Sequence, residues 1–221
     1  MEKHSNIKSI YITYILLDIL LLGIFTTFLV LTMVNSNFIN SLDSSVFNFV
    51  SNLRVPFITN LSLFITFFGE TITIVILLII SLIIFKKESF PIIIPTTISA
   101  ILNYIIKHIV QRARPVGQFV NNLIINYPFP DGYSFPSGHS QTGLVFYFFL
   151  FYFLLNKYYK GKHKKLILSL CLILPILIML SRVILGVHFF TDILCGALFG
   201  TLIIINYLFI EKLISMKKTN I

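Results

Sequence analysis

The stretch TITIVILLIISLIIF occupies residues 71–85, and two lysines, Lys86 and Lys87, follow it directly. With the apolar residues that precede it, from position 61 onward, it is long enough to cross a bilayer as a helix, which takes about 20 residues. The run is continuous and does not alternate as a membrane β-strand does. It therefore predicts a membrane-spanning helix that ends at a charged boundary.

Five further runs have a similar character, so the chain is expected to form six spans. They cover residues 10–34, 61–85, 90–107, 139–156, 166–185 and 189–210. The first run is too long for the apolar part of a signal peptide and has no small-residue cleavage site, so we interpret it as a retained span. The expected fold is an all-α membrane bundle in which residues 1–221 form one domain.

The overall composition excludes a soluble globular domain and a disordered chain. Hydrophobic residues make up 57% of the 221 residues, charged residues 11%, and the mean hydropathy is +0.92. A soluble domain carries about 25% charged residues, and a disordered chain has low hydrophobicity. Cys171 and Cys195 lie in apolar runs and predict neither a disulfide framework nor a zinc site.

The basic residues predict the orientation of the spans. Twelve lysines fall in the two termini and in the loops that a six-span topology places on the same side. By the positive-inside rule this side is cytoplasmic, and the protein is expected in the cell membrane. The lysines are thus topology signals, and no nucleic-acid partner is expected despite the net charge of +9. The extracytoplasmic side receives Lys107 and all four arginines.

Three short polar motifs lie at the extracytoplasmic ends of the predicted spans. They are Lys107-x6-Arg114-Pro115, Pro136-Ser137-Gly138-His139 and Ser181-Arg182-x5-His188-x3-Asp192. The spans were chosen by hydropathy alone, so the meeting of all three motifs at one membrane face is an independent observation. It predicts a single site there.

Two histidines in these motifs have different surroundings. His188 and Asp192 are four residues apart, so the carboxylate can accept a proton from one imidazole nitrogen and leave the other free as a nucleophile. His139 follows a helix start where Ser137 can act as the cap and a phosphate could bind. A bound phosphate would keep His139 protonated as a general acid. A polar pair closing a helix interface and an ordinary helix cap are the alternatives.

Positive charge for a phosphoryl group could come from Lys107, Arg114 and Arg182. Each of them alone could be a side chain that snorkels to the membrane boundary. Together, beside two histidines, they predict a clamp for phosphate and for transition-state charge. A metal held by His139, His188 and Asp192 is the competing reading, but three nearby cations would repel it. No cofactor is expected.

The ordered set of motifs resembles the three-part signature of the type 2 phosphatidic acid phosphatase family, which shares its site with vanadium haloperoxidases. The resemblance covers about residues 90–210. It implies a metal-independent phosphatase in which His188 forms a phosphohistidine, Asp192 is its partner and His139 protonates the leaving group. It further implies a set of phosphate-binding residues, namely Lys107, Arg114, Arg182, Ser137 and Gly138. The segment Phe189–Thr191 departs from the family pattern.

The function expected is hydrolysis of a lipid phosphate whose tail stays in the bilayer. Substrates implied by the resemblance are undecaprenyl pyrophosphate, phosphatidylglycerophosphate and phosphatidic acid. Short loops, which leave room for a bulky polyprenyl chain, favour the first. A phosphotransferase and a catalytically silent lipid-binding or transport protein are the alternatives, although a binding protein needs no nucleophile.

Several other positions carry structural predictions. Gly196 and Gly200 predict close helix packing, and Pro175 predicts a kink. A stripe along residues 42–53 predicts an amphipathic helix on the outer leaflet, and its members are Leu42, Val46, Phe49, Val50 and Leu53. Asp18 lies within an apolar run, and Glu70 is read as an interfacial residue that could border the site.

Overall fold

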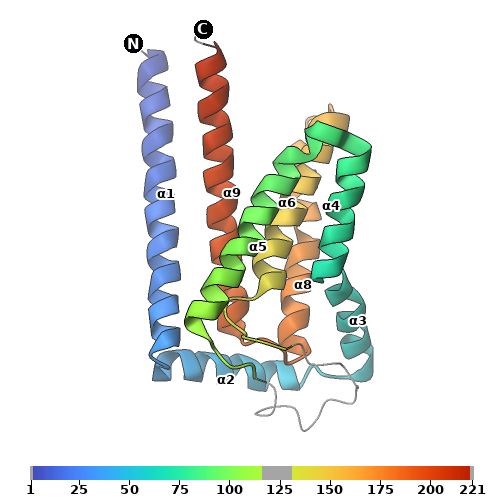
Figure 1. The fold of residues 1–221 in the computed structure, drawn as a ribbon. Coiled ribbons are helices and arrows are strands. Elements are labelled where there is room, and N and C mark those ends of the chain that lie inside the picture. The colour runs from blue at the N-terminus through green and yellow to red at the C-terminus, as the bar shows by residue number, and fades with distance from the viewer. Residues whose placement is uncertain (1, 116–130, 220–221) are drawn as a thin grey trace.

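The computed structural model describes residues 2–115 and 131–219, and every regular element within these ranges is a helix. Two long helices, α1 (Glu2–Met33) and α9 (Phe190–Thr219), stand side by side, with both termini at the same end of the molecule (Figure 1). At the opposite end α2 (Asn37–Ser51) lies across the base of the bundle (Figure 1). The predicted all-α class is confirmed.

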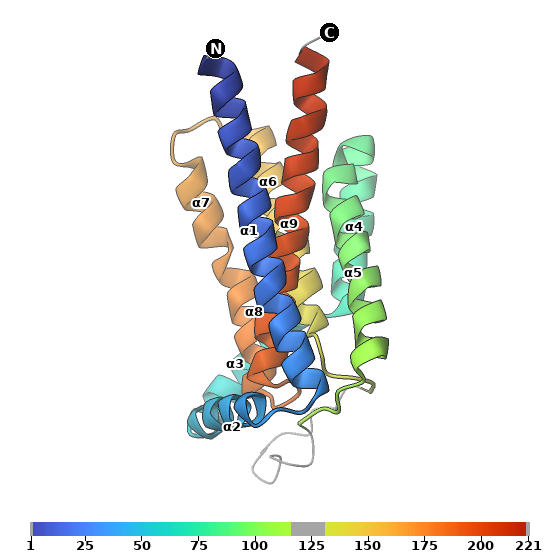
Figure 2. The same cartoon turned by 90° about the vertical axis from the view of Figure 1, so that its left-hand side faces the viewer.

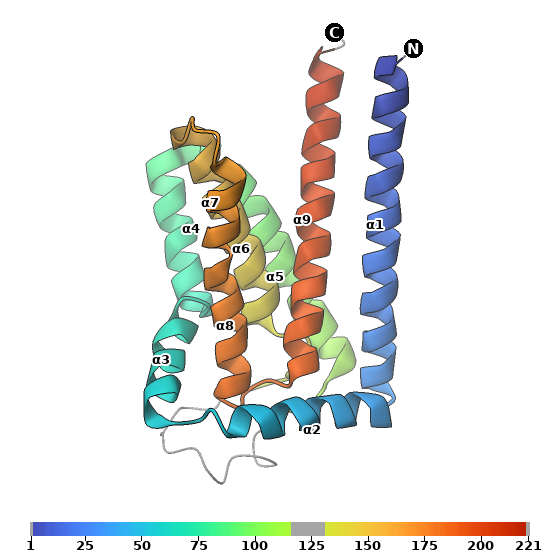
Figure 3. The same cartoon turned by 180° about the vertical axis from the view of Figure 1, so that it is seen from behind.

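The remaining helices form a tilted group beside the α1–α9 pair, as Figures 2 and 3 show. They are α3 (Pro56–Phe67), α4 (Thr71–Phe85), the 3₁₀ turn η1 (Lys86–Ser89), α5 (Phe90–Val110), α6 (Gly138–Tyr158), α7 (Lys164–Cys171) and α8 (Ile173–Ile184). Helix α6 packs against α5 on one side and α9 on the other. This places α6, which begins with the second motif, at the centre of the bundle.

Four helical segments of the described chain are long and apolar enough to span a membrane by themselves. They are Tyr11–Met33, Gly138–Tyr158, Lys164–Ile184 and Phe190–Met216. A fifth arises if Pro56–Phe67 and Thr71–Val110, which meet at an angle of 42°, are counted as one bent span. Six separate spans therefore remain a prediction.

The predicted span 61–85 is interrupted between α3 and α4, which sequence reasoning had treated as continuous. Gly69 lies in the break, and a Cβ atom there would be 2.6 Å from Cδ2 of His139 and 2.5 Å from a methyl group of Ile178. Only glycine allows the chain to approach this closely. The interruption thus brings the start of α4 onto the His139 ring.

The predicted span 166–185 is also divided, into α7 and α8, at Leu172. Pro175 follows three residues later and has no N–H to donate to the carbonyl of Cys171, one turn earlier. The division lies within one turn of Pro175, and Lys164–Ile184 still counts as one candidate span. The kink at Pro175 stays a prediction.

The surface of the bundle is apolar and part of its interior is polar, as expected where the surrounding solvent is lipid. Phe57, Ile72 and Ile83 expose 70–76% of their area, whereas Asn103 and Gln141 are buried between α5 and α6 and share a hydrogen bond of 2.9 Å. Buried polar groups need partners of this kind because no water reaches them.

The Gly196–Gly200 pair provides the close contact between α9 and α6. A Cβ atom on Gly196 would lie 2.7 Å from the carbonyl oxygen of Ser137, and one on Gly200 would lie 3.0 Å from that of Gln141. The predicted packing role is confirmed. Its consequence is that the first turn of α6 rests directly on the backbone of α9.

Helix α2 is amphipathic, as predicted. The residues of the expected stripe do not all share one side, because some face the protein and others face outward. Val50 is buried in a cluster with Met179 and Val183, while Phe49 and Leu53 are exposed. The face turned to the protein carries Ile39, Asp43, Phe47 and Val50. An aspartate thus occupies the buried face of this helix.

Candidate active site

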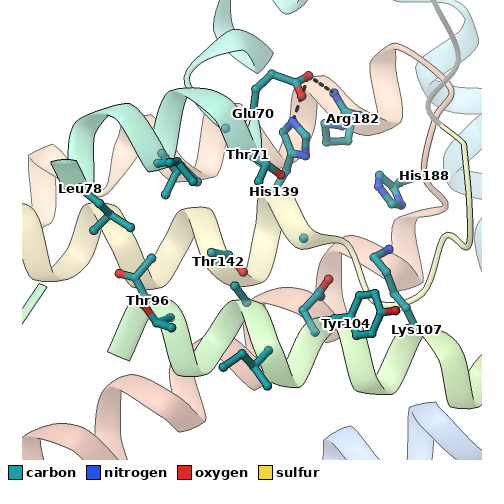
Figure 4. Close-up of a pocket in the computed structure, with 18 of the residues that line it drawn as sticks. Glu70, Thr71, Leu78, Thr96, Tyr104, Lys107, His139, Thr142, Arg182 and His188 are labelled. Carbon is teal, nitrogen blue, oxygen red and sulfur yellow. Dashed lines mark ion pairs between the residues drawn. The ribbon is translucent and has the colours of Figure 1, made fainter. Parts of the chain in front are cut away.

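The three sequence motifs meet at one end of a cavity of about 590 Å³. Its polar end is lined by Lys107 from α5, Arg114 just beyond it, His139 from α6, Arg182 from α8 and His188 from the loop before α9. Figure 4 shows Lys107, His139, Arg182 and His188 gathered at this end. Five of the predicted site residues therefore face a common space.

The His188–Asp192 pair has the predicted arrangement. Nδ1 of His188 lies 3.4 Å from Oδ2 of Asp192, and the same oxygen accepts the N–H of Phe189 at 2.9 Å. The other imidazole nitrogen, Nε2, is 3.2 Å from Nη1 of Arg114. A proton on Nδ1, donated to Asp192, fits both contacts, and it leaves the lone pair of Nε2 facing the guanidinium of Arg114.

The surroundings of the His188 imidazole favour its neutral form. Burial lowers the pKa of His188 well below its ordinary value, and the positive charges of Arg114 and Lys107 lower that pKa further. A neutral imidazole has the lone pair that nucleophilic attack requires.

The Pro-Ser-Gly-His motif forms the predicted helix start. The hydroxyl of Ser137 accepts the N–H of Ser140 at 3.4 Å, and the N–H of Ser137 donates to the carbonyl of Asp192 at 3.1 Å. Asn103 donates from its amide to the carbonyl of Pro136 at 3.2 Å. Gly138 lines the cavity, whereas Ser137 is fully buried, so the hydroxyl of Ser137 serves as the cap in this structure.

His139 faces a carboxylate that sequence reasoning had placed at the interface. Glu70 Oε1 is 3.4 Å from Nε2 of His139 and 3.7 Å from Nη1 of Arg182, and Figure 4 shows it between the two. Arg182 also donates to the hydroxyl of Thr66 at 2.5 Å. Glu70 therefore borders the site, as one of its two readings from the sequence allowed, because the break after α3 turns this residue toward the cavity.

Backbone carbonyls hold the other two cations in place. Lys107 Nζ donates to the carbonyl of Tyr133 at 2.8 Å. Arg114 donates from Nε to the carbonyl of Gly132 at 3.1 Å and from Nη1 to that of Val187 at 3.0 Å. Neutral acceptors fix these side chains without cancelling their charge, which keeps the positive potential at the cavity.

The sequence analysis missed two residues that support Asp192. Arg112 donates from Nη1 to Oδ1 of Asp192 at 2.7 Å and from Nη2 to Oδ2 of Asp43 at 2.6 Å. A signal for Asp43 existed, since it lies four residues from both Ile39 and Phe47 on the buried face of α2. For Arg112 the only hint was its place on the side that is poor in lysine.

The far end of the cavity is apolar and lies between α4 and α5. Ile74, Val75 and Leu78 line it from α4, and Ala100 and Ile101 line it from α5. In Figure 4, Leu78 lies at one end of the cavity and Lys107 and His188 lie at the other. A ligand that fills this space needs an anionic head and an apolar tail.

Among the described residues, no group of three or more His, Cys, Asp or Glu side chains could hold a metal ion. The five cavity-lining side chains of the motifs are instead two histidines and three cations. Such a set suits a phosphoryl group, while metal independence of the reaction stays a prediction.

The PAP2 superfamily model matches residues 89–213, a range that contains all three motifs. The chain belongs to the PAP2 superfamily. The resemblance predicted from the motifs is thereby confirmed, and with it the expectation of a membrane hydrolase.

Two curated proteins are similar in sequence. Phosphatidylglycerophosphatase B of Bacillus subtilis is 28% identical over 189 residues, which cover 82% of this chain and 89% of that protein. Undecaprenyl-diphosphatase of Sulfolobus acidocaldarius is 31% identical over 136 residues, or 60% of each chain. The names of the two proteins refer to different lipid substrates, so sequence similarity alone does not identify the substrate of this chain.

Two solved structures share the fold. A transmembrane PAP2-type phosphatidylglycerolphosphate phosphatase from Bacillus subtilis has a TM-score of 0.76 at 24% identity and covers 88% of this chain and 96% of its own. LpxE of Aquifex aeolicus has a TM-score of 0.58 at 27% identity and covers 74% of this chain and 93% of its own. Both support the membrane bundle as the fold.

Proposed function

We propose that the protein removes phosphate from a lipid phosphate or lipid diphosphate at the extracytoplasmic face of the cell membrane. The observation that carries this is the two-ended cavity, in which His188, His139 and three cations meet an apolar groove between α4 and α5. The sequence relatives, which are lipid phosphatases by name, support the same substrate class.

The chemistry proceeds through a phosphohistidine. Nε2 of His188 attacks phosphorus while Asp192 accepts the hydrogen bond from Nδ1 and stabilises the imidazolium that forms. Lys107, Arg114 and Arg182 neutralise the equatorial oxygens, with Arg114 moving its contact from Nε2 to one of them.

His139 serves both halves of the reaction. It protonates the leaving oxygen, which belongs to the lipid alcohol in a monophosphate and to the lipid monophosphate in a diphosphate. It then takes a proton from the water that attacks the phosphohistidine. Glu70, 3.4 Å from Nε2 of His139, stabilises the imidazolium that acts as the acid. The products are inorganic phosphate and the rest of the lipid, which is the lipid alcohol from a monophosphate and the lipid monophosphate from a diphosphate.

The site draws on residues both before and within the family match, which supports one domain over residues 1–221. The family match begins at residue 89, yet the cavity wall includes Glu70, Ile74 and Leu78. The segment before the match therefore supplies one side of the groove that would hold the lipid tail.

A substrate panel tests the proposal. Purified protein in detergent is incubated with undecaprenyl diphosphate, phosphatidylglycerophosphate, phosphatidic acid and water-soluble glycerol phosphate, with and without a chelator, and phosphate release is measured. We expect one lipid to be preferred, glycerol phosphate to be poor and the chelator to have no effect. The matched control is His108→Ala, which removes an exposed histidine and should leave activity unchanged. Absence of release from every lipid contradicts the proposal.

The groove is tested separately from the chemistry. Ala100→Trp fills the apolar end of the cavity and should lower kcat/KM for the lipid while sparing an aryl phosphate of low molecular weight. Ile83→Trp is the control, because Ile83 on α4 is 70% exposed to the surrounding lipid. Equal losses on both substrates would show that the tail does not occupy this space.

Topology is tested with single cysteines in a background that lacks Cys171 and Cys195. The segment 117–132 is expected outside, but residues 116–130 lie outside the described part of the chain, so Asp131→Cys, at an exposed position, is used. It should react with an impermeant thiol reagent in intact cells, and Lys162→Cys should not. The reverse pattern would overturn six spans with cytoplasmic termini.

A further inference from the structure

Helix α9 begins without a hydrogen-bond acceptor on the side chain at its N-cap position. Residue 189, just before its first residue, is a phenylalanine with no acceptor atom. The first N–H groups of a helix have no partner within the helix, and Ser, Thr, Asp or Asn usually accepts from them. Here Oδ2 of Asp192 accepts the N–H of Phe189 and Oδ1 of Asp43 accepts that of Thr191, both at 2.9 Å. Helix α2 thus caps α9 from 148 residues away in sequence.

Asp43 and Asp192 are joined through one arginine. Arg112 contacts Asp43 at 2.6 Å and Asp192 at 2.7 Å. The hydroxyl of Thr191 accepts from Nη1 of Arg112 at 2.7 Å and donates to Oδ2 of Asp43 at 2.8 Å. Asp43 and Asp192 expose 4% and 0% of their area, so these bonds are made away from water, where charge-assisted bonds are strong.

This network lies behind the proposed catalytic pair. Asp192 uses Oδ1 for Arg112 and Oδ2 for His188 and the N–H of Phe189. A shift of Arg112 or of the first turn of α9 must therefore rotate the carboxylate against the imidazole. Displacements of about 1 Å in such supports can cost about 100-fold in rate.

We propose that Asp43 is a positioning residue for the His188–Asp192 pair, acting from α2 through Arg112 and Thr191. The inference rests on the proposed function, in which His188 is the nucleophile. Asp43 acts in two ways. It shares the charge of Arg112, which would otherwise fall entirely on Asp192, and it caps the turn that carries Thr191 and Asp192.

The test uses Asp43→Asn, which keeps the size of the side chain and an oxygen for the N–H of Thr191 but removes the shared charge. We expect kcat to fall about 10–100-fold while KM changes less than about threefold. Asp43→Glu, which restores the charge, should recover part of the loss. The control is Asp18→Asn, since Asp18 is an aspartate on α1 whose Oδ1 accepts from Asn206 at 2.6 Å.

Inhibition constants show whether Asp43→Asn misplaces the His188–Asp192 pair or only lowers the amount of folded protein. They can do so because an inhibition constant does not depend on the fraction of protein that is active. Vanadate mimics the five-coordinate transition state and needs His188 in place, whereas inorganic phosphate needs only the cations. Asp43→Asn should weaken vanadate about tenfold or more and phosphate less than about threefold. A simple folding defect leaves both constants unchanged.

The outcomes distinguish the two levels of the argument. If the wild-type protein releases no phosphate and binds no vanadate, the proposed function fails. If the wild-type protein is active and Asp43→Asn has the same vanadate constant, the inference about Asp43 is wrong. An equal change in both inhibition constants also contradicts it, because the cations rather than the pair would then have moved.

Discussion

Two acidic residues within apolar helices have different surroundings in this molecule. Asp192 at the start of α9 is fully buried and contacts Arg112, His188 and a backbone N–H. Asp18 on α1 is partly exposed, contacts Asn206 on α9 at 2.6 Å and borders an apolar cavity of about 320 Å³. An ionisable residue in a span suggests function, but the groups around it decide which kind. Arg112 and the proposed nucleophile His188 contact Asp192, whereas Asp18 links two helices.

The most severe way to break the candidate active site is to remove its proposed nucleophile. His188→Ala should lower phosphate release by at least about 10⁴-fold with every substrate, because nothing replaces the attacking nitrogen. No phosphoenzyme should be trapped by rapid acid-free quenching with labelled substrate. A labelled phosphoenzyme in this variant would move the nucleophile elsewhere.

Removing the proposed acid should have a smaller and substrate-dependent effect. With His139→Ala, lipid turnover should fall about 10²–10⁴-fold, because a lipid alkoxide needs a proton to leave. An activated aryl phosphate needs none, so its first step should be largely spared. Acid-labile phosphohistidine should then accumulate, since the second step lacks its base, and its absence would contradict the assigned role.

The contact between α6 and α9 can be disturbed without touching a polar side chain. Gly196→Ala puts a methyl group 2.7 Å from the Ser137 carbonyl, so the first turn of α6 must move. We expect a loss of about 1–3 kcal/mol in stability and a lower kcat. Gly143→Ala on α6 is the control, because a Cβ atom there meets nothing within 4 Å. Thermal inactivation that is equal in both variants would contradict the packing argument.

The pH dependence should reflect the buried state of His188. Its pKa is lowered, so the imidazole takes up a proton only below its ordinary range and stays nucleophilic as the solution becomes mildly acidic. With an aryl phosphate that remains dianionic, kcat/KM should fall less than about twofold between pH 7 and pH 6. A half-maximal loss at or above pH 6.5 would show that His188 titrates normally.

A substitution at Asp18 on α1 should have the smallest effect on activity. Asp18→Asn keeps a hydrogen-bonding side chain opposite Asn206, and α1 packs on α9, so activity should stay within about twofold of wild type. A loss as large as that of Asp43→Asn would show that the α1–α9 contact reaches the site and would remove the distinction drawn here.

Sequence reasoning succeeded where the information was local. Hydropathy predicted the helical class, and spacing identified the motif residues, of which Lys107, Arg114, His139, Arg182 and His188 share the cavity. The packing role of Gly196 and Gly200 could be inferred for the same reason, since it depends on the small size of one residue type. The helix boundary near Pro175 is likewise a place where one residue has a local effect.

What the sequence did not reveal depends on contacts between distant segments. Asp43 and Arg112 are 69 residues apart; Asp43 lies outside the motifs, and Arg112 occupies an unspecified position between Lys107 and Arg114. Glu70 faces His139 only because the chain breaks at Gly69. Such pairs are fixed by the packing of whole helices, so the spacing of residue types along the chain does not contain them.

The groove between α4 and α5 has a consequence for the kinetics, because it decides which measure of substrate concentration would set the rate. If the lipid tail stays in the membrane while the head reaches His188, encounters occur by diffusion in two dimensions. Turnover would then follow the mole fraction of substrate in the leaflet rather than its bulk concentration, and dilution with inert lipid would slow it at constant total substrate. The two products would separate by phase, with phosphate released into water and the lipid returned to the bilayer.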